Sequence, residues 1–422
     1  MSFVMKMLAS LTLAVALTLP PMPAPDAPET PESTEPEITT REHAPDTDDC
    51  PNVLTPPEPR TTSEVPQPGA DPTPLPVVVD GPCGVTAPRG FDVPEEVHAS
   101  AWLVADMDTG EVIAAKDPHG RYRPASIIKV LLAMVALEEL DPAREVVIDR
   151  ASAEQIGSAV GIGEGGTYTV DELLHGLMLA SGNDAAHALA QELGGDEATL
   201  EKVNRLAREL GTTDTRAASY SGLDAPGMST SAFDMGLIYR AAYATPRLAE
   251  IMNTDHIPFP GFDDLPGFEV WNDNGLLMND EHGLGGKTGF TDDANHTFVG
   301  AKRADGRRLF AVVLDTTVEK ARAWQQAQLL IDAASPTPAG EGVGLLEPVS
   351  VTEPEPEDEE APAEVPGVHE ADDPRLGVEA GIIAVIVVGV LALLGVVLSV
   401  RAYARPRRRP TGRGSRGNRS PA

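Results

Sequence analysis

Residues 123–137, RPASIIKVLLAMVAL, predict a buried helix that contains a single lysine within its apolar run. Every residue of 127–137 is apolar except Lys129, which follows Ser126 by three positions. If the helix opens at Pro124, Ser126 lies in its first turn. Because residues i and i+3 share one face of a helix, we expect the Lys129 side chain beside the Ser126 hydroxyl.

A serine hydroxyl beside a buried lysine is suited to nucleophilic catalysis. The hydroxyl is a weak nucleophile until a base removes its proton, and burial lowers the pKa of a lysine, which makes a neutral amine available as that base. The first turn of the helix also offers a free backbone N–H group to an oxyanion. The pattern Ser-x-x-Lys is common by chance, and the alternative is a lysine whose stem packs while its ammonium reaches solvent.

Two pairs of β-rich runs lie at the two ends of the region that contains this helix. The first pair turns at residues 108–110 (Asp-Thr-Gly) and the second at residues 305–306 (Asp-Gly), and both turns are hairpin signatures. Between them the chain is mostly helical, with a capping box at residues 169–172 and an amphipathic run at residues 200–210. We therefore predict an α+β fold over residues 87–335, with an antiparallel sheet from both chain ends and an inserted helical block.

A second polar motif, Ser-Gly-Asn at residues 181–183, separates two apolar helical runs. Polar side chains between buried helices need hydrogen-bond partners, and an active site would supply them. The alternative interpretation is a corner between two helices, in which Asn183 or Asp184 caps the second helix.

A third motif, Lys-Thr-Gly at residues 287–289, follows two glycines and precedes a β-rich run. An ammonium and a hydroxyl at the edge of a strand can hold a substrate carboxylate. Gly289 would let the substrate backbone approach closely. The alternative is a surface turn that carries one lysine.

The three motifs together are far more specific than each alone. Ser-x-x-Lys is followed by Ser-x-Asn after 55 residues and by Lys-Thr-Gly after a further 106 residues. This order and spacing resemble the penicillin-recognising serine enzymes. The forms PASIIKV, SGNDAA and GGKTGFTDDA are similar to those of the D-alanyl-D-alanine carboxypeptidases, the low-molecular-mass penicillin-binding proteins. The resemblance covers residues 99–334 and implies a β-lactamase/transpeptidase-like fold. The predicted export and membrane anchor of this chain are similar to those of the actinobacterial branch of the family.

The resemblance implies a role for each residue of the first two motifs. Ser126 would be the nucleophile that becomes acylated, and Lys129 would be its general base. Ser181 would help to pass the proton to the leaving D-alanine amine. Asn183 would orient Lys129 and the amide of the substrate.

The same resemblance assigns substrate binding to the third motif. Lys287 and Thr288 would bind the terminal carboxylate of a peptidoglycan stem peptide that ends in D-Ala-D-Ala. The backbone N–H groups of Ser126 and Phe290 would form the oxyanion hole. A second cation at Lys287 would further lower the pKa of Lys129. β-Lactams would be covalent inhibitors, and no cofactor or metal is implied.

Four other classes of protein are alternatives to a D-alanyl-D-alanine carboxypeptidase. A class A β-lactamase shares the three motifs but needs a Glu-Pro-x-x-Asn loop between the second and the third, and the sequence between Asn183 and Lys287 lacks it. Glu164 precedes Ser181 and therefore lies in the wrong order. A D,D-endopeptidase that acts on cross-links, a non-enzymatic β-lactam receptor and a wall-binding protein remain alternatives.

The flanks of the predicted domain carry export and membrane signals. An apolar run of 13 residues at 7–19 ends at two prolines, as in a signal peptide. Residues 380–400 contain neither charge nor proline, and about 20 such residues span a ~30 Å hydrocarbon core. We predict five flanking segments: a signal peptide at 1–24, a Pro-rich exported segment at 25–86, a Pro/Glu-rich linker at 336–375, a transmembrane helix at 376–400 and a basic cytoplasmic tail at 401–422.

Charge and cysteine content fit an exported protein anchored by a single span in the cell membrane, with its catalytic domain on the wall side. The net charge is −33, although the last 22 residues hold eight arginines and no acid, so the rest is still more acidic. This acidity argues against nucleic acid as a partner. The arginines place the tail on the cytoplasmic side. The two cysteines, Cys50 and Cys83, predict a structural disulfide in an oxidising compartment, and we expect the Pro-rich flanks to be disordered.

Overall fold

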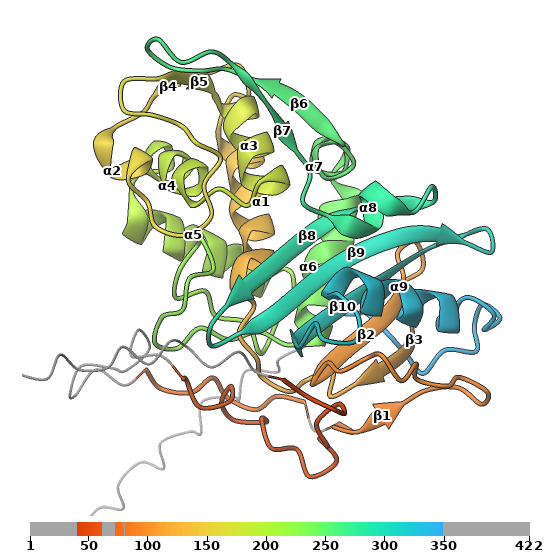
Figure 1. Ribbon diagram of the computed structural model, residues 1–422. Helices are drawn as coiled ribbons and strands as arrows, with labels where there is room; N and C mark the ends of the chain where they lie inside the picture. Colours follow the sequence, from red (N-terminus) through yellow and green to blue (C-terminus); the bar gives the residue numbers. More distant parts are fainter. Residues whose placement is uncertain (1–39, 61–71, 80, 349–422) are drawn as a thin grey trace, which may run out of the picture. The chain divides into compact units, whose positions relative to one another are not determined.

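The computed structural model describes residues 40–60, 72–79 and 81–348. A seven-stranded antiparallel sheet has the order β1–β3–β2–β10–β9–β8, and β11 also pairs with β3 (Figure 1). Strands from the two ends of the domain thus lie side by side, with β2 next to β10, which confirms the predicted α+β arrangement. The strands of this sheet are β1 (Val85–Thr86), β2 (Ala101–Asp106), β3 (Glu111–Lys116), β8 (Gly283–Thr291), β9 (Asn295–Ala304), β10 (Arg307–Thr316) and β11 (Gly344–Leu345).

Both predicted hairpins are present, and their turns have the backbone that their sequences favour. Between β9 and β10, Asp305 and Gly306 have φ values of 48° and 79°. Positive φ at both central residues is the condition of a type I′ turn, whose twist matches that of the strands. Gly110 closes the turn between β2 and β3 with φ 78°, and its N–H donates to Asp106 O at 2.9 Å.

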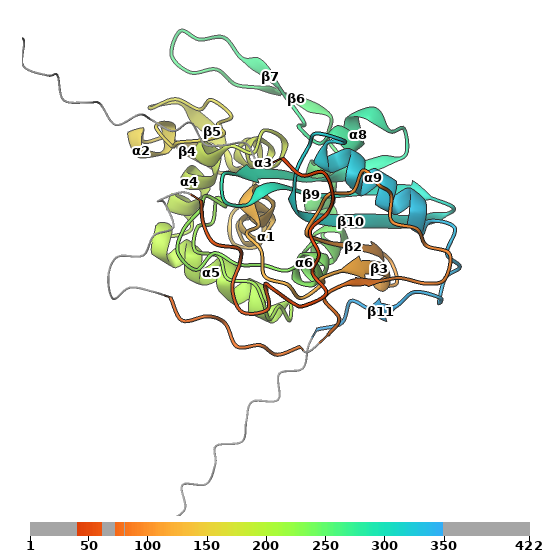
Figure 2. The ribbon, with the colours of Figure 1, turned by 60° about the horizontal axis from the view of Figure 1, so that its bottom comes forward.

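Successive side chains along each strand point to opposite faces of the sheet and so contribute to two hydrophobic layers, one on each face. Leu103 and Phe310 belong to the layer that also contains α1 (Lys129–Glu139) and α6 (Ala232–Ala244). Trp102 and Val313 belong to the layer that contains α9 (Ala323–Ala334), which covers the opposite face (Figure 2). Because successive strand residues point to opposite faces, the almost continuous apolar runs of β2 and β10 serve both layers.

The inserted block lies on one side of the sheet, as Figure 1 shows. The predicted capping box is present at the start of α3, where Thr169 Oγ1 accepts from Glu172 N at 3.1 Å and Thr169 N donates to Glu172 Oε2 at 2.7 Å. The elements of the block and its exit are β4 (Glu145–Val147), α2 (Arg150–Ala153), β5 (Thr167–Thr169), α3 (Val170–Leu179), α4 (Asn183–Glu192), α5 (Asp196–Glu209), α7 (Pro246–Met252), β6 (His256–Phe259), β7 (Phe268–Trp271) and α8 (Gly275–Asn279).

The start of the central helix differs from the prediction. Residues Ala125–Ile128 form a 3-10 turn, η2, and the α-helix begins only at Lys129. Ala125 has φ 50°, a left-handed conformation that no α-helical turn contains. Since side chains at i and i+3 eclipse in a 3-10 turn, Ser126 and Lys129 still share one face.

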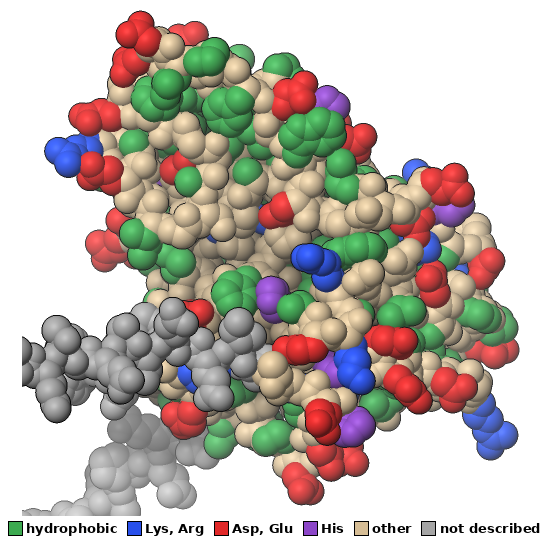
Figure 3. Space-filling model, viewed as in Figure 1, with side chains coloured by type: hydrophobic (Ala, Val, Ile, Leu, Met, Phe, Trp, Pro, Cys, Tyr) green, Lys and Arg blue, Asp and Glu red, His purple; other side chains and the backbone are tan. Residues whose placement is uncertain are grey.

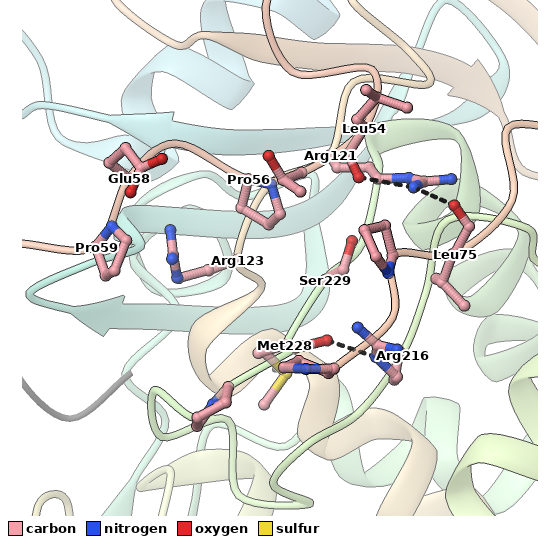
Figure 4. A pocket seen from close by; sticks show the side chains of 15 residues that line it. Leu54, Pro56, Glu58, Pro59, Leu75, Arg121, Arg123, Arg216, Met228 and Ser229 are labelled. Atoms are coloured by element: carbon pink, nitrogen blue, oxygen red, sulfur yellow. Dashed lines mark hydrogen bonds between the residues drawn. The ribbon is translucent and has the colours of Figure 1, made fainter. Parts of the chain in front are cut away.

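The N-terminal Pro-rich segment is ordered where the structure describes it, which corrects the prediction of a disordered flank. Residues 40–60 and 72–79 contain no helix or strand, but buried arginines bind their backbone. Arg121 donates to Leu54 O at 2.8 Å and to Leu75 O at 2.7 Å across a cavity of about 370 Å³ (Figure 4). Guanidinium groups thus donate hydrogen bonds to backbone carbonyl groups of the Pro-rich segment, which does not pair with a strand of the sheet.

The predicted disulfide is confirmed. Cys50 and Cys83 are bonded, with their Cα atoms 5.2 Å apart, and the bridge ties the N-terminal segment to the chain just before β1. The predicted signal peptide, transmembrane helix and basic tail, and most of the predicted linker, lie outside the described residues. Within residues 40–60, 72–79 and 81–348, no helix is both long and apolar enough to cross a membrane.

Candidate active site

Lys129 and Ser126 meet at the junction of η2 and α1. Lys129 Nζ lies 2.8 Å from Ser126 Oγ, and the Lys129 side chain is fully buried. The ammonium does not reach solvent, so the alternative of a lysine head at the surface is wrong. Two further oxygens complete its surroundings: Asn183 Oδ1 at 2.7 Å and Ser221 O at 2.5 Å. All three partners are uncharged.

The segment that contains Ser221 is a part of the site that the motifs did not indicate. Its carbonyl is the third partner of Lys129, and it also lies 3.4 Å from Ser126 Oγ. The next residue, Gly222, has φ 83°, and a Cβ there would come within 2.1 Å of Ala125 O. A glycine is therefore required where this segment crosses the start of η2. A backbone acceptor has no side-chain signature, which is why sequence patterns missed it.

The predicted Ser-Gly-Asn motif forms the corner between α3 and α4. Asn183, the first residue of α4, donates from Nδ2 to Ile156 O at 2.6 Å while its Oδ1 faces Lys129. Ser181 is buried and has φ 58°, and its hydroxyl makes no hydrogen bond with the described residues. Asp184 accepts from the N–H groups of three successive residues at 160–162, which fixes the loop beside the corner. The motif therefore forms both a corner between two helices and a part of the site, but the predicted cap is wrong, because the N-cap of α4 is Gly182 and no side chain caps the helix.

The Lys-Thr-Gly motif lies on β8, the strand at the edge of the sheet. Lys287 is fully buried, and its Nζ lies 3.3 Å from Thr288 Oγ1. Gly289 passes directly against η2, because a Cβ there would lie 3.0 Å from Ser126 N and 3.1 Å from Ala125 Cβ. The motif is thus not an isolated surface turn, since it borders the nucleophile's own backbone.

Phe290 follows on the same edge, and its side chain is 55 % exposed against His296 of β9, with ring centroids 4.6 Å apart. Among the strands of the described residues, none pairs with the outer side of β8. An edge of this kind can pair with an extended peptide.

An acidic residue that the sequence analysis did not single out lies beside this motif. Asp273, in the turn between β7 and α8, accepts from Thr288 Oγ1 at 2.7 Å, and its Oδ2 lies 3.5 Å from Lys287 Nζ. Its side chain is 36 % exposed. It precedes Lys287 by 14 positions in the chain and matches none of the three motifs, so no pattern pointed to it.

The two lysines have lowered pKa values for related reasons. Burial is the main cause that holds the pKa of Lys129 well below its ordinary value, and the positive charge of Lys287 lowers it further. The more distant carboxylates of Asp273 and Asp184 act in the opposite direction. Burial also lowers the pKa of Lys287, but the adjacent Asp273 partly restores it. These surroundings favour the neutral amine more strongly at Lys129 than at Lys287, which has the adjacent carboxylate.

The described residues show no carboxylate that is hydrogen-bonded to Ser126 or Lys129. Glu164 is exposed in the loop that precedes α3. In the same described ranges, no group of three or more His, Cys, Asp or Glu side chains is arranged to hold a metal ion. The 2.8 Å contact between Lys129 Nζ and Ser126 Oγ supports the chemistry of a serine nucleophile with a lysine base.

The surface is hollowed between the helical block and the β8 side of the sheet. Figure 3 shows this hollow with a mostly uncharged floor, while acidic side chains are spread over the surrounding surface. Motifs from η2, from the α3–α4 corner and from β8 thus converge, since Lys129 contacts the first two and Gly289 lies against η2.

Comparison with known proteins agrees with this geometry. A family model described as D-alanyl-D-alanine carboxypeptidase, peptidase S11, matches residues 88–318, more than half of the chain. The chain belongs to the D-alanyl-D-alanine carboxypeptidase family. A member of this family is a serine hydrolase, as the paired Ser126 and Lys129 imply.

Several members of the S11 family resemble the chain over the same region. The D-alanyl-D-alanine carboxypeptidase DacB2 of Mycobacterium tuberculosis is 44% identical over 238 residues, which cover 56% of this chain and 81% of that protein. DacD of Escherichia coli is 32% identical, over 56% of this chain and 63% of that protein. The match to the first covers most of that protein's length.

Solved structures give the same result for the fold. The crystal structure of a D-alanyl-D-alanine carboxypeptidase from Mycobacterium tuberculosis H37Rv superposes with a TM-score of 0.59 and 40% identity, covering 62% of this chain and 99% of that one. A mutant of the Streptomyces K15 DD-transpeptidase superposes with a TM-score of 0.54 at 24% identity, over 57% of this chain and 99% of that one. The second likeness concerns the fold alone, which is the penicillin-binding, transpeptidase-like fold.

Proposed function

We propose that the protein removes the terminal D-alanine from peptidoglycan stem peptides that end in D-Ala-D-Ala, through an acyl-enzyme on Ser126, and that penicillins acylate the same serine. Family membership supports this reaction class. The observation that carries the residue assignment is the 2.8 Å contact between Lys129 Nζ and Ser126 Oγ, in surroundings that favour an uncharged amine.

The hydrogen-bonding capacity of Lys129 matches the role of a base. A neutral amine has two N–H donors and one lone pair. Asn183 Oδ1 and Ser221 O would accept from the two donors, which leaves the lone pair for the Ser126 hydroxyl proton. Ser126 Oγ then attacks the carbonyl carbon of the penultimate D-alanine as its proton passes to Lys129 Nζ. Collapse of the tetrahedral intermediate breaks the C–N bond, and a proton passes to the leaving D-alanine amine, with Ser181 as the proposed relay.

Binding of the substrate would use the edge of the sheet. The peptide would lie along β8, with the carbonyl oxygen between the N–H groups of Ser126 and Phe290. The close approach of Gly289 to Ser126 N supports this placement, because it brings the two donors together. Lys287 and Thr288 would hold the terminal carboxylate. Water then hydrolyses the ester and restores Ser126.

Penicilloylated enzyme should be long-lived, in contrast to the acyl-enzyme of a β-lactamase. Rapid hydrolysis of a penicilloyl ester needs a base that activates water at the ester. The lack of a carboxylate contact to Ser126 or Lys129 in the described residues supports slow turnover of β-lactams.

The proposed location is the wall side of the cell membrane. The predicted signal peptide at 1–24, the predicted span at 376–400 and the basic tail at 401–422 support export and anchoring. The disulfide between Cys50 and Cys83 also fits an oxidising compartment.

Two measurements test the proposed reaction. The purified chain should release D-alanine from a pentapeptide that ends in D-Ala-D-Ala, and mass spectrometry should locate one penicilloyl group on Ser126. Ser126→Ala should lose both. D-alanine release at an unchanged rate in Ser126→Ala would refute the assignment, whereas acylation without any peptidase activity would favour the receptor alternative.

A further inference from the structure

Asp273 lies in a turn that its two neighbours hold in place. Asn272 and Asn274 are buried: Asn272 Nδ2 donates to Thr254 O at 2.9 Å, and Asn274 Oδ1 accepts from Leu276 N at 3.0 Å. The backbone of the turn is therefore fixed by the asparagines. The carboxylate of Asp273 plays no part in these bonds and faces β8 instead.

Among the described residues, the Asp273 carboxylate has side-chain bonds only to Lys287 and Thr288. Its Oδ2 accepts from Thr288 Oγ1 at 2.7 Å and lies 3.5 Å from Lys287 Nζ. These two donors are the ones that the proposed function assigns to the terminal carboxylate of the substrate. A side-chain carboxylate of the protein thus contacts the two donors that the proposed function gives to the terminal carboxylate of the substrate.

We propose that Asp273 is a specificity-determining residue that occupies the carboxylate subsite in the free enzyme and disfavours peptides with a free terminal carboxylate relative to peptides with a terminal carboxamide. This inference rests on the proposed function, because it concerns the same subsite. A substrate carboxylate has to displace Asp273 or lie beside it as a like charge. The 36 % exposure of the Asp273 side chain leaves it room to turn away from Thr288.

A carboxamide meets neither obstacle. Its oxygen can accept from Thr288 Oγ1 or Lys287 Nζ, while its N–H group donates to the Asp273 carboxylate. The charge of Asp273 therefore opposes a terminal carboxylate more than an uncharged terminal amide in a D-alanyl peptide bound at this subsite. Specificity of this kind arises from a repulsive element as well as from an attractive one.

The test compares two peptides that differ only at the terminal group. Each ends in D-Ala-D-Ala, one with a free carboxylate and the other with a carboxamide, and kcat/KM is measured for both. Asp273→Asn keeps the size of the side chain and a hydrogen-bond acceptor for Thr288 but removes the charge. We expect the ratio of kcat/KM, carboxylate over carboxamide, to rise about two- to fivefold, the range for one partly exposed charge pair. Asp273→Ala should change the ratio in the same direction.

Glu269→Gln provides a matched control. Glu269 is exposed on β7, in the same hairpin, and the substitution changes the charge by the same amount. It should leave the ratio as in the wild type. A ratio that is unchanged in Asp273→Asn, or that moves equally in Glu269→Gln, overturns the inference while the peptidase activity still stands. If the wild type hydrolyses neither peptide and Ser126 is not acylated by penicillin, the proposed function fails instead.

Discussion

Lys129 and Lys287 are both fully buried, yet their surroundings differ in one respect that decides their chemistry. Lys129, on the helical side of the site, contacts a hydroxyl, an amide oxygen and a backbone carbonyl, none of which is charged. Lys287, on the sheet side, lies 3.5 Å from the carboxylate of Asp273. Burial disfavours the charged form of both, but only Lys287 has an adjacent anion that offsets the effect.

The difference shows how one type of side chain can serve two purposes in one site. A lysine without a counter-ion in a buried place gives up its proton readily and can act as a base. A lysine with a counter-ion stays a cation and can bind an anion. The two functions are coupled as well, since the charge on Lys287 lowers the pKa of Lys129.

The largest expected effect comes from removal of the base. In Lys129→Ala we expect the acylation rate by penicillin to fall by about 10³-fold or more, because a positioned general base contributes about 10²–10⁴-fold. The domain should stay folded, since the lost side chain has no ion pair in the described structure. Rapid mixing and quenching, followed by mass spectrometry, measures the rate at which the penicilloyl adduct forms.

Lys302→Ala is a suitable control for this variant. Lys302 is also largely buried, but its Nζ is paired with Asp280 at 2.6 Å and with Asp332 at 3.0 Å, on the α9 side of the sheet. Acylation should proceed at the normal rate there. A penicilloyl adduct that forms at the normal rate in Lys129→Ala would show that Lys129 is not the base, so the contrast between the two lysines would not explain their chemistry.

Substitution of the second lysine should affect recognition more than chemistry. In Lys287→Gln we expect kcat/KM for the carboxylate-terminated peptide to fall about 10- to 100-fold, which corresponds to the loss of one hydrogen bond to a charged group. The carboxamide-terminated peptide should lose much less. Equal losses for both peptides would show that Lys287 does not read the terminal carboxylate.

The pH dependence of acylation tests the coupling between the two lysines. The base acts when neutral, so the rate should rise with pH through the lowered pKa of Lys129 and then level off. Lys287→Gln removes the positive charge that lowers this pKa, so the rising limb should move to higher pH. Asp273→Asn removes a negative charge that raises it, so the limb should move to lower pH.

A rate profile that moves the same way in both variants, or in neither, would show that Lys129 does not provide the titrating base. Lys302→Ala should leave the profile unchanged, because its carboxylate partners lie outside the site.

The features of the fold and the site that could be predicted from the sequence are those that depend on neighbouring residues or on the chemistry of a side chain. The hairpins and the capping box follow from short-range turn and cap rules, and both appear as predicted. The disulfide followed from cysteine number and compartment, and it is present. The three motifs, at residues 126–129, 181–183 and 287–289, mark side chains whose types are constrained by chemistry.

The parts that the sequence did not reveal depend on backbone or on distant contacts. The carbonyl of Ser221 has no side-chain signature. The left-handed backbone of Ala125, whose carbonyl oxygen lies against Gly222, has none either. Asp273 looks like an ordinary turn residue between two asparagines until the sheet brings β8 beside it. The order of residues 40–60 likewise depends on Arg121, which no local pattern in that segment indicates.

The smallest expected effect comes from a variant that changes only the stability of the domain. It serves as the reference for the substitutions of both lysines. Thr169→Ala removes the N-cap of α3, where Thr169 Oγ1 accepts from Glu172 N, and we expect a loss of about 1 kcal/mol in the free energy of unfolding. For a domain of this size that corresponds to roughly 2–4 °C in Tm, measurable by thermal unfolding. The acylation rate and its pH profile should stay as in the wild type, because α3 keeps its packing and Asn183 keeps its bond to Lys129. If the profile moved with this small loss of stability, shifts in the lysine variants would reflect loosened packing and not the charges of the two ammonium groups.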